Sequence, residues 1–345
     1  MTPGDISATP LGELRVAVVG AGMMGADHIR RITTRTVGAT VAAVVEPDKA
    51  RADAATAMAP GATAYSRIED AIAAGGIDAV LIATPGEYHE PVLLPALKAG
   101  LSILCEKPLT FDAESSRRVL EAEQKLDRPH IQVGFMRRFD PEYLQLKELI
   151  VSGSAGALLA LRCVHRNPRV DAFTDSRMIT DSVVHEIDVV PWLVGEPISA
   201  IEVKYPKQSS LAPEGLRDPQ LVLLETESGV LADVEINVNV QFGYQVSTDA
   251  VFERGVAEIG RTGGLSIYKD GGFWRTEHQD FRTRFGVAYD VEVQHWVDAA
   301  RRGTIDGPNS WDGYLANVVC EAGIKAQSIG QRVEIKTEAR PAFYS

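Results

Sequence analysis

The chain has 345 residues, of which 45% are hydrophobic and 24% are charged, and its formal net charge is -12. At roughly 150 residues per domain, this length predicts about two domains. The acidic balance argues against a broad basic surface for nucleic acid or anionic lipid, and no apolar run approaches the roughly 20 residues of a membrane helix, so we expect neither partner.

The three cysteines, Cys105, Cys163 and Cys320, are far apart and form no CxxC pair. They predict neither a disulfide framework nor a zinc site, and no HExxH motif offers another metal site. The first fifteen residues lack the basic start and the apolar core of a secretory signal. We therefore expect a cytoplasmic protein without a bound metal.

A short apolar strand, Leu14 to Val19, runs into the glycine-rich turn Gly20-Ala-Gly-Met-Met-Gly25, and a helix follows from about Asp27. In a GxGxxG turn between strand and helix, the first glycine permits the tight turn, and the second lets the backbone approach a pyrophosphate. The third glycine allows close packing of the helix on the strand. We assign dinucleotide binding to Gly20, Gly22, Met23, Met24 and Gly25.

A second buried strand, Thr40 to Val45, ends in Glu46, about 20 residues beyond the last glycine. A carboxylate at this place suits the ribose hydroxyls of the adenosine and repels a 2'-phosphate, which favours NAD over NADP. The nearby cations Lys49 and Arg51 weaken that preference. The alternative is that Glu46 merely begins the next helix.

Helices are then predicted over 48–59, 68–74, 89–99 and 112–126, and strands over 62–65, 79–83, 102–105 and 131–133. This alternation predicts an α/β doubly wound parallel sheet, a Rossmann domain that spans residues 1–133. Ligands of such sheets lie beyond the carboxyl ends of the strands. We therefore assign the cofactor site also to Ala83, Thr84, Pro85, His89, Glu106 and Lys107.

Two of these assignments have plain structural alternatives. Thr84 and Pro85 could simply end a strand, and Lys107 could be a surface lysine that follows one. Pro108 biases Lys107 toward an extended backbone, from which the lysine can point into the crevice at the carboxyl end of the sheet.

The pattern changes after residue 133. Asp140 and Pro141 begin a helix that runs to about Ile150, and an extended run covers residues 158–165. Val234, Ile236, Val238, Val240 and Phe242 then alternate with polar residues, and turn signals separate further runs of this kind. Residues 134–345 are therefore predicted to form an α+β domain with a large open antiparallel sheet.

Before these strands lies the sequence Asp181-Ser-Val-Val-His185-Glu-Ile-Asp188. On a helix, Asp181, His185 and Asp188 lie at positions i, i+4 and i+7 of one face. Histidine titrates near neutral pH and can accept a proton there, whereas the alternative is a core or capping histidine.

Together these motifs resemble the glucose-fructose oxidoreductase, inositol dehydrogenase and rhizopine catabolism family, written GFO/IDH/MocA. The resemblance covers nearly the whole chain and is carried by Gly20 to Gly25, Glu106-Lys107-Pro108 and Asp181-x-x-x-His185. Residues 134–140, 165–168 and 185–188 look most like the inositol 2-dehydrogenases of that family. The sequence differs from that group at Ser182, where threonine is usual, and at Glu46, where aspartate is usual.

The resemblance implies a Rossmann domain joined to an open-faced sheet through which such proteins often form tetramers. It further implies a catalytic group of Lys107, Asp181 and His185, with a polyol pocket formed by Arg137, His165, Ser182, Asp188 and Tyr244. A structural role is the alternative for Arg137, His165 and Tyr244.

The expected reaction is the NAD-linked oxidation of a ring hydroxyl of a cyclitol, myo-inositol or a close isomer, to a ketone. The hydride goes to NAD, His185 takes the hydroxyl proton, Asp181 orients the imidazole, and Lys107 stabilises the developing alkoxide. One alternative is oxidation of a pyranose sugar or a glycoside. Another is a non-catalytic dinucleotide-binding regulator, which predicts that Lys107 or His185 is missing, whereas both are present.

Overall fold

The computed structural model describes residues 12–168, 173–261 and 266–345. The first layer of the fold is a parallel sheet of six strands in the order β3-β2-β1-β4-β5-β6, which is the doubly wound order of a Rossmann domain. The strands are β1 (Leu14–Val19), β2 (Ala39–Val45), β3 (Thr63–Tyr65), β4 (Ala79–Ile82), β5 (Ser102–Glu106) and β6 (Ile131–Gly134).

The helices that connect these strands are α1 (Met23–Thr34), α2 (Lys49–Met58), α3 (Ile68–Ala74), α4 (His89–Lys98) and α5 (Ala113–Glu123), with a short 3-10 turn, η1 (Gly86–Tyr88). Most predicted elements agree with the structure to within a few residues. Helix α1 is the exception, because it begins at Met23, four residues earlier than Asp27, with Gly22 as its N-cap. The helix therefore starts inside the glycine-rich turn and directs its N-terminus at the proposed pyrophosphate site.

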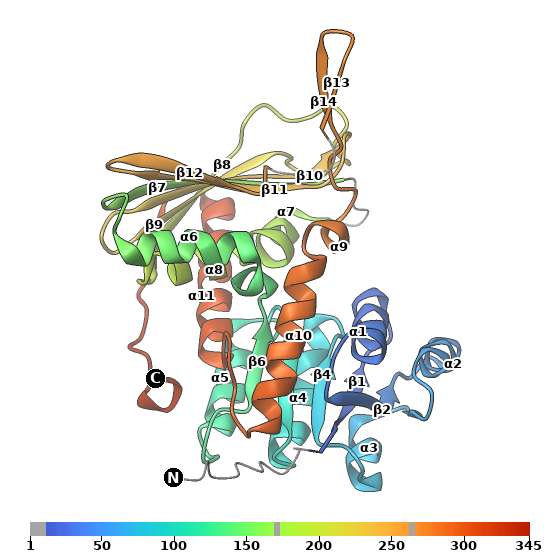
Figure 1. Ribbon diagram of the computed structural model, residues 1–345. Helices are drawn as coiled ribbons and strands as arrows, with labels where there is room; N and C mark the ends of the chain where they lie inside the picture. Colours follow the sequence, from blue (N-terminus) through green and yellow to red (C-terminus); the bar gives the residue numbers. More distant parts are fainter. Residues whose placement is uncertain (1–11, 169–172, 262–265) are drawn as a thin grey trace, which may run out of the picture.

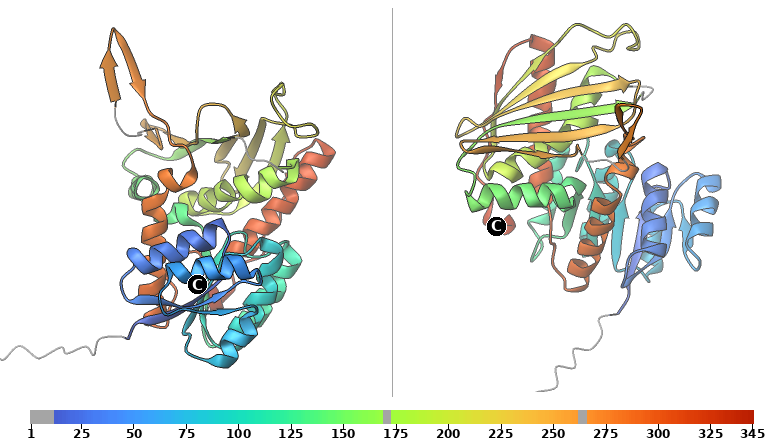
Figure 2. Two further views of the ribbon diagram at one scale, coloured as in Figure 1. Left: turned by 90° about the vertical axis from the view of Figure 1, so that its right-hand side faces the viewer. Right: turned by 45° about the horizontal axis from the view of Figure 1, so that its top comes forward.

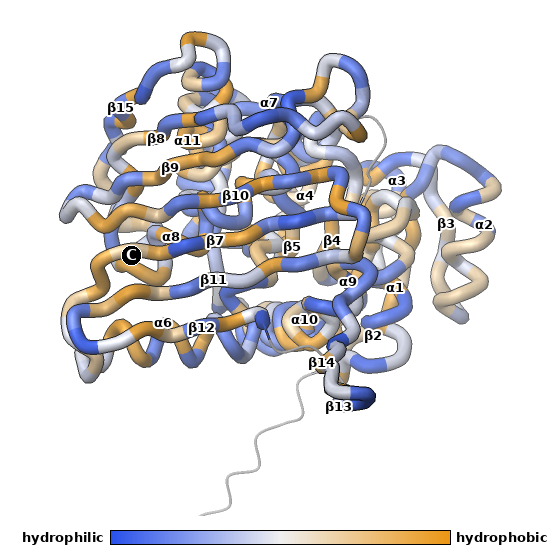
Figure 3. Tube along the Cα trace, turned by 90° about the horizontal axis from the view of Figure 1, so that it is seen from above, coloured by the Kyte–Doolittle hydropathy of each residue, from blue (hydrophilic) through white to orange (hydrophobic). Residues whose placement is uncertain are grey.

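The second layer is a seven-stranded sheet in the order β12-β11-β7-β10-β9-β8-β15. Its strands are β7 (Leu158–Pro168), β8 (Ile198–Lys204), β9 (Gln220–Thr226), β10 (Leu231–Val240), β11 (Gln245–Phe252), β12 (Gly255–Ile259) and β15 (Val333–Glu334). One face of this sheet rests on helices, and the other is open, as the view from above shows (Figures 1 and 3).

The predicted pairing of this second sheet needs one correction. Strands β7 and β10 are parallel neighbours, whereas the other pairs of the sheet are antiparallel. The parallel pair arises because β10 returns from its hairpin with β9 into the place beside β7, so the sheet is mixed. Phe242 also departs from the predicted apolar face: β10 ends at Val240, and the Phe242 side chain beyond it is exposed.

The remaining elements connect the two layers. They are η2 (Met136–Phe139), α6 (Pro141–Ser152), α7 (Asp175–Arg177), the π-helical turn η3 (Met178–Val183), α8 (Val184–Val194), the hairpin β13 (Ser266–Lys269) with β14 (Gly272–Arg275), α9 (Phe281–Arg284), α10 (Gly286–Arg301), α11 (Ser310–Ile329) and η4 (Ala342–Tyr344). The β13–β14 hairpin projects from the body of the molecule (Figure 2).

Helix α10 packs on the Rossmann sheet although it comes late in the chain (Figure 1). Its residues Val293 and Trp296 share one core with Val16 of β1 and Leu104 of β5. Helix α11 contacts both α5 and β8 and so spans the two layers. A segment late in the chain therefore completes the core of the first domain. The predicted boundary between residues 133 and 134 stays a prediction.

Candidate active site

The glycine-rich turn is closely packed except at its middle residue. Gly20 has a φ of +89°, and a Cβ atom there would lie 2.9 Å from the Ala83 carbonyl oxygen. A Cβ atom on Gly25 would lie only 1.8 Å from the Gly20 oxygen, whereas one on Gly22 would meet nothing within 4 Å. The turn therefore leaves open space at the residue where a pyrophosphate would approach the backbone, and so fits a dinucleotide. Next to Gly22, the Met23 side chain is exposed and that of Met24 is partly buried.

Glu46 lies at the carboxyl end of β2 and is buried, with 6% of its surface exposed. Its carboxylate accepts hydrogen bonds from the backbone nitrogens of Ala21, at 2.9 Å, and Asp48, at 3.0 Å. The Arg51 guanidinium lies 3.2 Å from the same carboxylate. Glu46 thus joins the end of β2 to the glycine-rich turn, where a ribose hydroxyl could replace a backbone donor, and Arg51 is the nearby cation that the sequence indicated.

His89 connects the loop after β4 with the loop after β5. Its ring is fully buried, with Nε2 at 2.8 Å from the Thr84 carbonyl oxygen and Nδ1 at 2.8 Å from that of Pro108. The Thr84 hydroxyl is buried without a hydrogen-bond partner. His89 therefore holds the loop that carries Thr84 and Pro85 through these two contacts, and it supports the predicted cofactor site indirectly.

Lys107 follows β5 and reaches across to the second domain. Its Nζ atom donates a hydrogen bond of 2.8 Å to the backbone carbonyl oxygen of Asp181 in η3. Burial lowers the pKa of Lys107, while the charges of Asp181 and Glu106 act in the opposite direction. A lysine ammonium has three donors, so two remain for a substrate oxygen.

His185 lies at the first turn of α8 and is buried, with an unpartnered Nδ1 atom. Its ring centroid is 6.2 Å from that of His165, which is in turn 6.3 Å from the ring centroid of Tyr244. Burial lowers the pKa of His185 well below its usual value, and the charges of Lys107 and Arg137 lower it further. The imidazole is therefore neutral at pH 7 and can accept a proton.

The predicted contact between Asp181 and His185 is absent. The Asp181 carboxylate accepts a hydrogen bond of 3.0 Å from the Thr180 hydroxyl and lies 3.4 Å from the Arg177 guanidinium. Arg177 stands one helical turn before Asp181 and competes for its charge, and spacing alone did not reveal this competition. In this structure Asp181 holds Lys107 through its backbone carbonyl, and its carboxylate pairs with Thr180 and Arg177 and not with the imidazole.

Arg137 belongs to a buried network rather than to an open pocket wall. It forms an ion pair with Glu186 and lies 3.2 Å from Nδ1 of His165, which is itself 3.1 Å from Glu186. Sequence analysis missed Glu186. The signal that could have found it is its place beside His185 on a largely apolar helix, where a buried acid requires a partner.

Ser182 and Asp188 have different partners. The Ser182 hydroxyl lies 3.4 Å from the side-chain nitrogen of Asn167 in β7, the strand that also carries His165. Asp188, in contrast, is paired with Arg138, and burial raises the pKa of its carboxyl to about 6. Arg138 lies 3.6 Å from Asp312 of α11 as well, so Asp188 belongs to a group of charges between α8 and α11, and its contact with a polyol stays a prediction.

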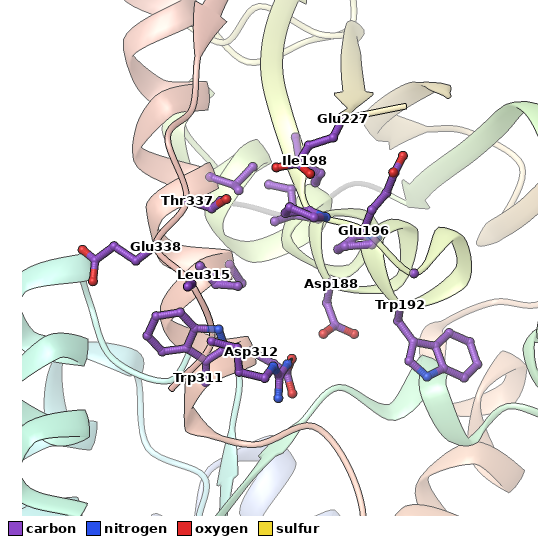
Figure 4. Close-up of a pocket in the computed structure, with 18 of the residues that line it drawn as sticks. Asp188, Trp192, Glu196, Ile198, Glu227, Trp311, Asp312, Leu315, Thr337 and Glu338 are labelled. Carbon is purple, nitrogen blue, oxygen red and sulfur yellow. Dashed lines mark hydrogen bonds and ion pairs between the residues drawn. The ribbon is translucent and has the colours of Figure 1, made fainter. Parts of the chain in front are cut away.

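Asp188 also lines a cavity of about 570 Å³ between α8, α11 and the C-terminal segment. Figure 4 shows its carboxylate near Asp312 and Trp192. None of Lys107, Asp181 and His185 lines this cavity. The candidate active site is therefore the group of Lys107, His165, His185 and Tyr244, which faces the carboxyl ends of β4 and β5.

Two further findings concern metal ions and membranes. Within the described residues, no group of three or more histidine, cysteine, aspartate or glutamate side chains could hold a metal ion. In the same ranges, no helix has the length and apolar character needed to cross a membrane.

A Rossmann domain that carries a lysine at its dinucleotide site, opposite buried histidines of a separate sheet domain, is typical of nicotinamide-dependent oxidoreductases. Residues 14–135 match the model of the GFO/IDH/MocA oxidoreductase family, NAD-binding Rossmann fold, and residues 143–258 match the C-terminal domain of that family. The chain belongs to the GFO/IDH/MocA family. The predicted family, fold class and NAD cofactor are thereby confirmed.

Known proteins resemble the chain over nearly its full length. An inositol 2-dehydrogenase of Corynebacterium glutamicum is 62% identical over 96% of this chain and 99% of its own. One of Leifsonia xyli is 58% identical over 99% of this chain and 100% of its own. The crystal structure of myo-inositol dehydrogenase from Lactobacillus casei, in complex with NAD(H) and myo-inositol, superposes with a TM-score of 0.94 at 34% identity and covers 96% of this chain and 100% of its own.

Proposed function

We propose that the protein is an NAD-dependent dehydrogenase that oxidises a ring hydroxyl of an inositol to a ketone. The observation that carries this proposal is the contact between Lys107 and the Asp181 backbone beside the neutral His185. This contact brings a donor from the cofactor domain and a base from the substrate domain to one place. The relatives of 62% and 58% identity are inositol 2-dehydrogenases, which supports a cyclitol as substrate.

The residues would divide the reaction as follows. NAD, held by the glycine-rich turn and Glu46, supplies the acceptor for the hydride of the carbinol carbon. Lys107 donates to the hydroxyl oxygen and stabilises negative charge that develops on it. His185 accepts the hydroxyl proton, which its lowered pKa permits because the ring is neutral at working pH. The Tyr244 ring lies beside His165, and Ser182 comes three residues before His185; both are proposed to bind further hydroxyls.

Arg137 and His165 have a second part in this proposal. The contacts with Arg137 and Glu186 engage Nδ1 of His165 and fix its ring next to His185, and the other ring nitrogen is proposed to bind the substrate. We propose that Asp181 turns its carboxylate to His185 during turnover and stabilises the imidazolium. This rotation must break the contact with Arg177.

The direct test is the formation of NADH with NAD or NADP and a panel of myo-, scyllo- and chiro-inositols, glucose, galactose, xylose and simple glycosides. We expect strong NAD-linked turnover of an inositol and weak turnover of sugars. Preference for a sugar or a glycoside would move the substrate to the alternative, and inactivity with the whole panel would contradict the proposal.

Two further properties are proposed. The open face of the second sheet carries exposed apolar residues, Leu159, Leu231 and Val256, which supports assembly of a homotetramer through this face. Light scattering tests this, and a monomer would contradict it. The three cysteines are buried free thiols, which supports a reducing compartment, the cytoplasm, and cell fractionation tests this.

A further inference from the structure

Glu292 on α10 is a fully buried acid for which the proposed reaction has no role. None of its surface is exposed, and neither carboxyl oxygen has a hydrogen-bond partner. A buried carboxyl group without a partner is costly to the fold and needs an explanation. Its neighbours give one.

Helix α10 covers the face of the Rossmann sheet to which Glu106 points. Leu104 and Glu106 alternate on one face of β5, and Leu104 packs in the same core as Val293 and Trp296 of α10. One turn before Glu292, the Tyr289 ring meets His28 edge-on at a centroid distance of 6.0 Å. Glu292 therefore lies next to the end of β5 and the start of α1.

The Glu106 carboxylate is tied to Lys107. Its Oε1 atom lies 2.7 Å from Nε2 of His28, and its Oε2 atom accepts a hydrogen bond of 3.3 Å from the backbone nitrogen of Lys107. A Cβ atom on Gly134 would lie 3.1 Å from Oε2, so only glycine leaves the carboxylate this room without displacement. Whatever fixes Glu106 therefore also fixes the backbone from which Lys107 projects.

The groups that face Glu292 determine its charge. Burial raises the pKa of Glu292 well above its usual value, and the negative charges of Glu106 on β5 and Asp188 on α8 raise it further, while Arg31 on α1 acts the other way. Burial thus favours the neutral form of Glu292, which has an O–H donor to offer. The unpaired atoms of Glu292, His28, Gln132 and Trp296 are of the kind that buried water ordinarily satisfies.

We propose that Glu292 is a positioning residue: through buried water it donates a hydrogen bond to the Glu106–His28 pair and so holds Lys107 at the active site. The proposal rests on the dehydrogenase function. Without this positioning role, Glu292 would be only a buried acid without a partner, which destabilises the fold. Its removal should then harm neither stability nor turnover.

The test compares Glu292→Leu with Glu292→Gln. Leucine has a similar volume but no donor, and we expect about tenfold lower kcat, about fivefold weaker NADH binding and a melting temperature no lower than that of the wild type. The amide of glutamine keeps a neutral donor, so Glu292→Gln should retain kcat within about twofold and the pH profile of the wild type.

Glu123→Gln is the matched control. Glu123 is equally buried but lies on α5 and accepts hydrogen bonds from the backbone of His130 and Ile131, so this variant should lose stability and keep kcat. Wild-type kcat and NADH affinity in Glu292→Leu would overturn the proposal, and so would a Glu292→Gln variant as impaired as Glu292→Leu. If the wild type oxidises no polyol, the dehydrogenase function fails, and the NADH affinities of the two variants still decide the role of Glu292.

Discussion

The two domains contribute to the site in different ways. In the Rossmann domain, the glycine-rich part of the proposed cofactor site is local in sequence: the turn from Gly20 to Gly25 is built by backbone conformation, and Glu46 bonds to that turn directly. In the second domain, Arg137, His165 and Glu186 come from three elements and are fixed by one another. The first kind of site follows from spacing, whereas the second exists only once the chain has folded.

The largest expected effect on turnover comes from a substitution of His185, which lies where the two domains meet. His185→Ala removes the proposed base, and we expect kcat with an inositol to fall about 10³-fold while NADH still binds. Steady-state kinetics together with NADH fluorescence titration measure both quantities. His295→Ala is the control, because that histidine is half exposed and near Asp306 instead of the site, and it should keep full turnover. A His185→Ala enzyme that retains most of its turnover at neutral pH would eliminate the base role.

The glycine-rich turn offers a matched pair of substitutions that separates fold from binding. In Gly25→Ala the new methyl collides with the Gly20 carbonyl oxygen. We expect the free energy of unfolding to fall by about 3 kcal/mol or more. In Gly22→Ala the methyl meets open space, so stability should stay within about 0.5 kcal/mol. Only the affinity for NADH should fall there, by about tenfold. Thermal unfolding and NADH titration give both values, and equal stability loss in the two variants would refute the explanation.

Elements with strong local signals could be predicted from the sequence, and elements decided by tertiary contacts could not. The βαβ alternation and the GxGxxG turn depend on neighbouring residues, and the structure agrees with them closely. The parallel pairing of β7 with β10 depends on a connection of more than sixty residues and leaves no periodic signal. Similarly, Asp181 has the right spacing to meet His185, but Arg177 lies at the same spacing on its other side and takes the carboxylate.

A smaller effect concerns the pH dependence of stability in the second domain. The pKa of His185 is lowered on folding, so below about pH 6.5 the unfolded chain takes up a proton that the folded chain does not, and stability falls as the pH falls. His185→Gln removes this contribution. Between pH 6.5 and 5.5 the variant should lose about 1 kcal/mol less than the wild type in denaturant titrations. Parallel curves for the two proteins would show that the imidazole is not held neutral by the fold.

The smallest effect decides what Asp181 does, and it depends on separating its backbone from its side chain. Asp181→Asn keeps the carbonyl that binds Lys107, so any change reports on the carboxylate alone. If the carboxylate turns to His185 during turnover, the variant should lose about tenfold in kcat, and the acid limb of its pH profile should move to lower pH, because a neighbouring negative charge raises the pKa of an imidazole. Arg177→Ala removes the competing cation and should leave kcat undiminished. An Asp181→Asn enzyme with an unchanged pH profile would mean that Asp181 serves the site only through its backbone, and that the base works without a carboxylate partner.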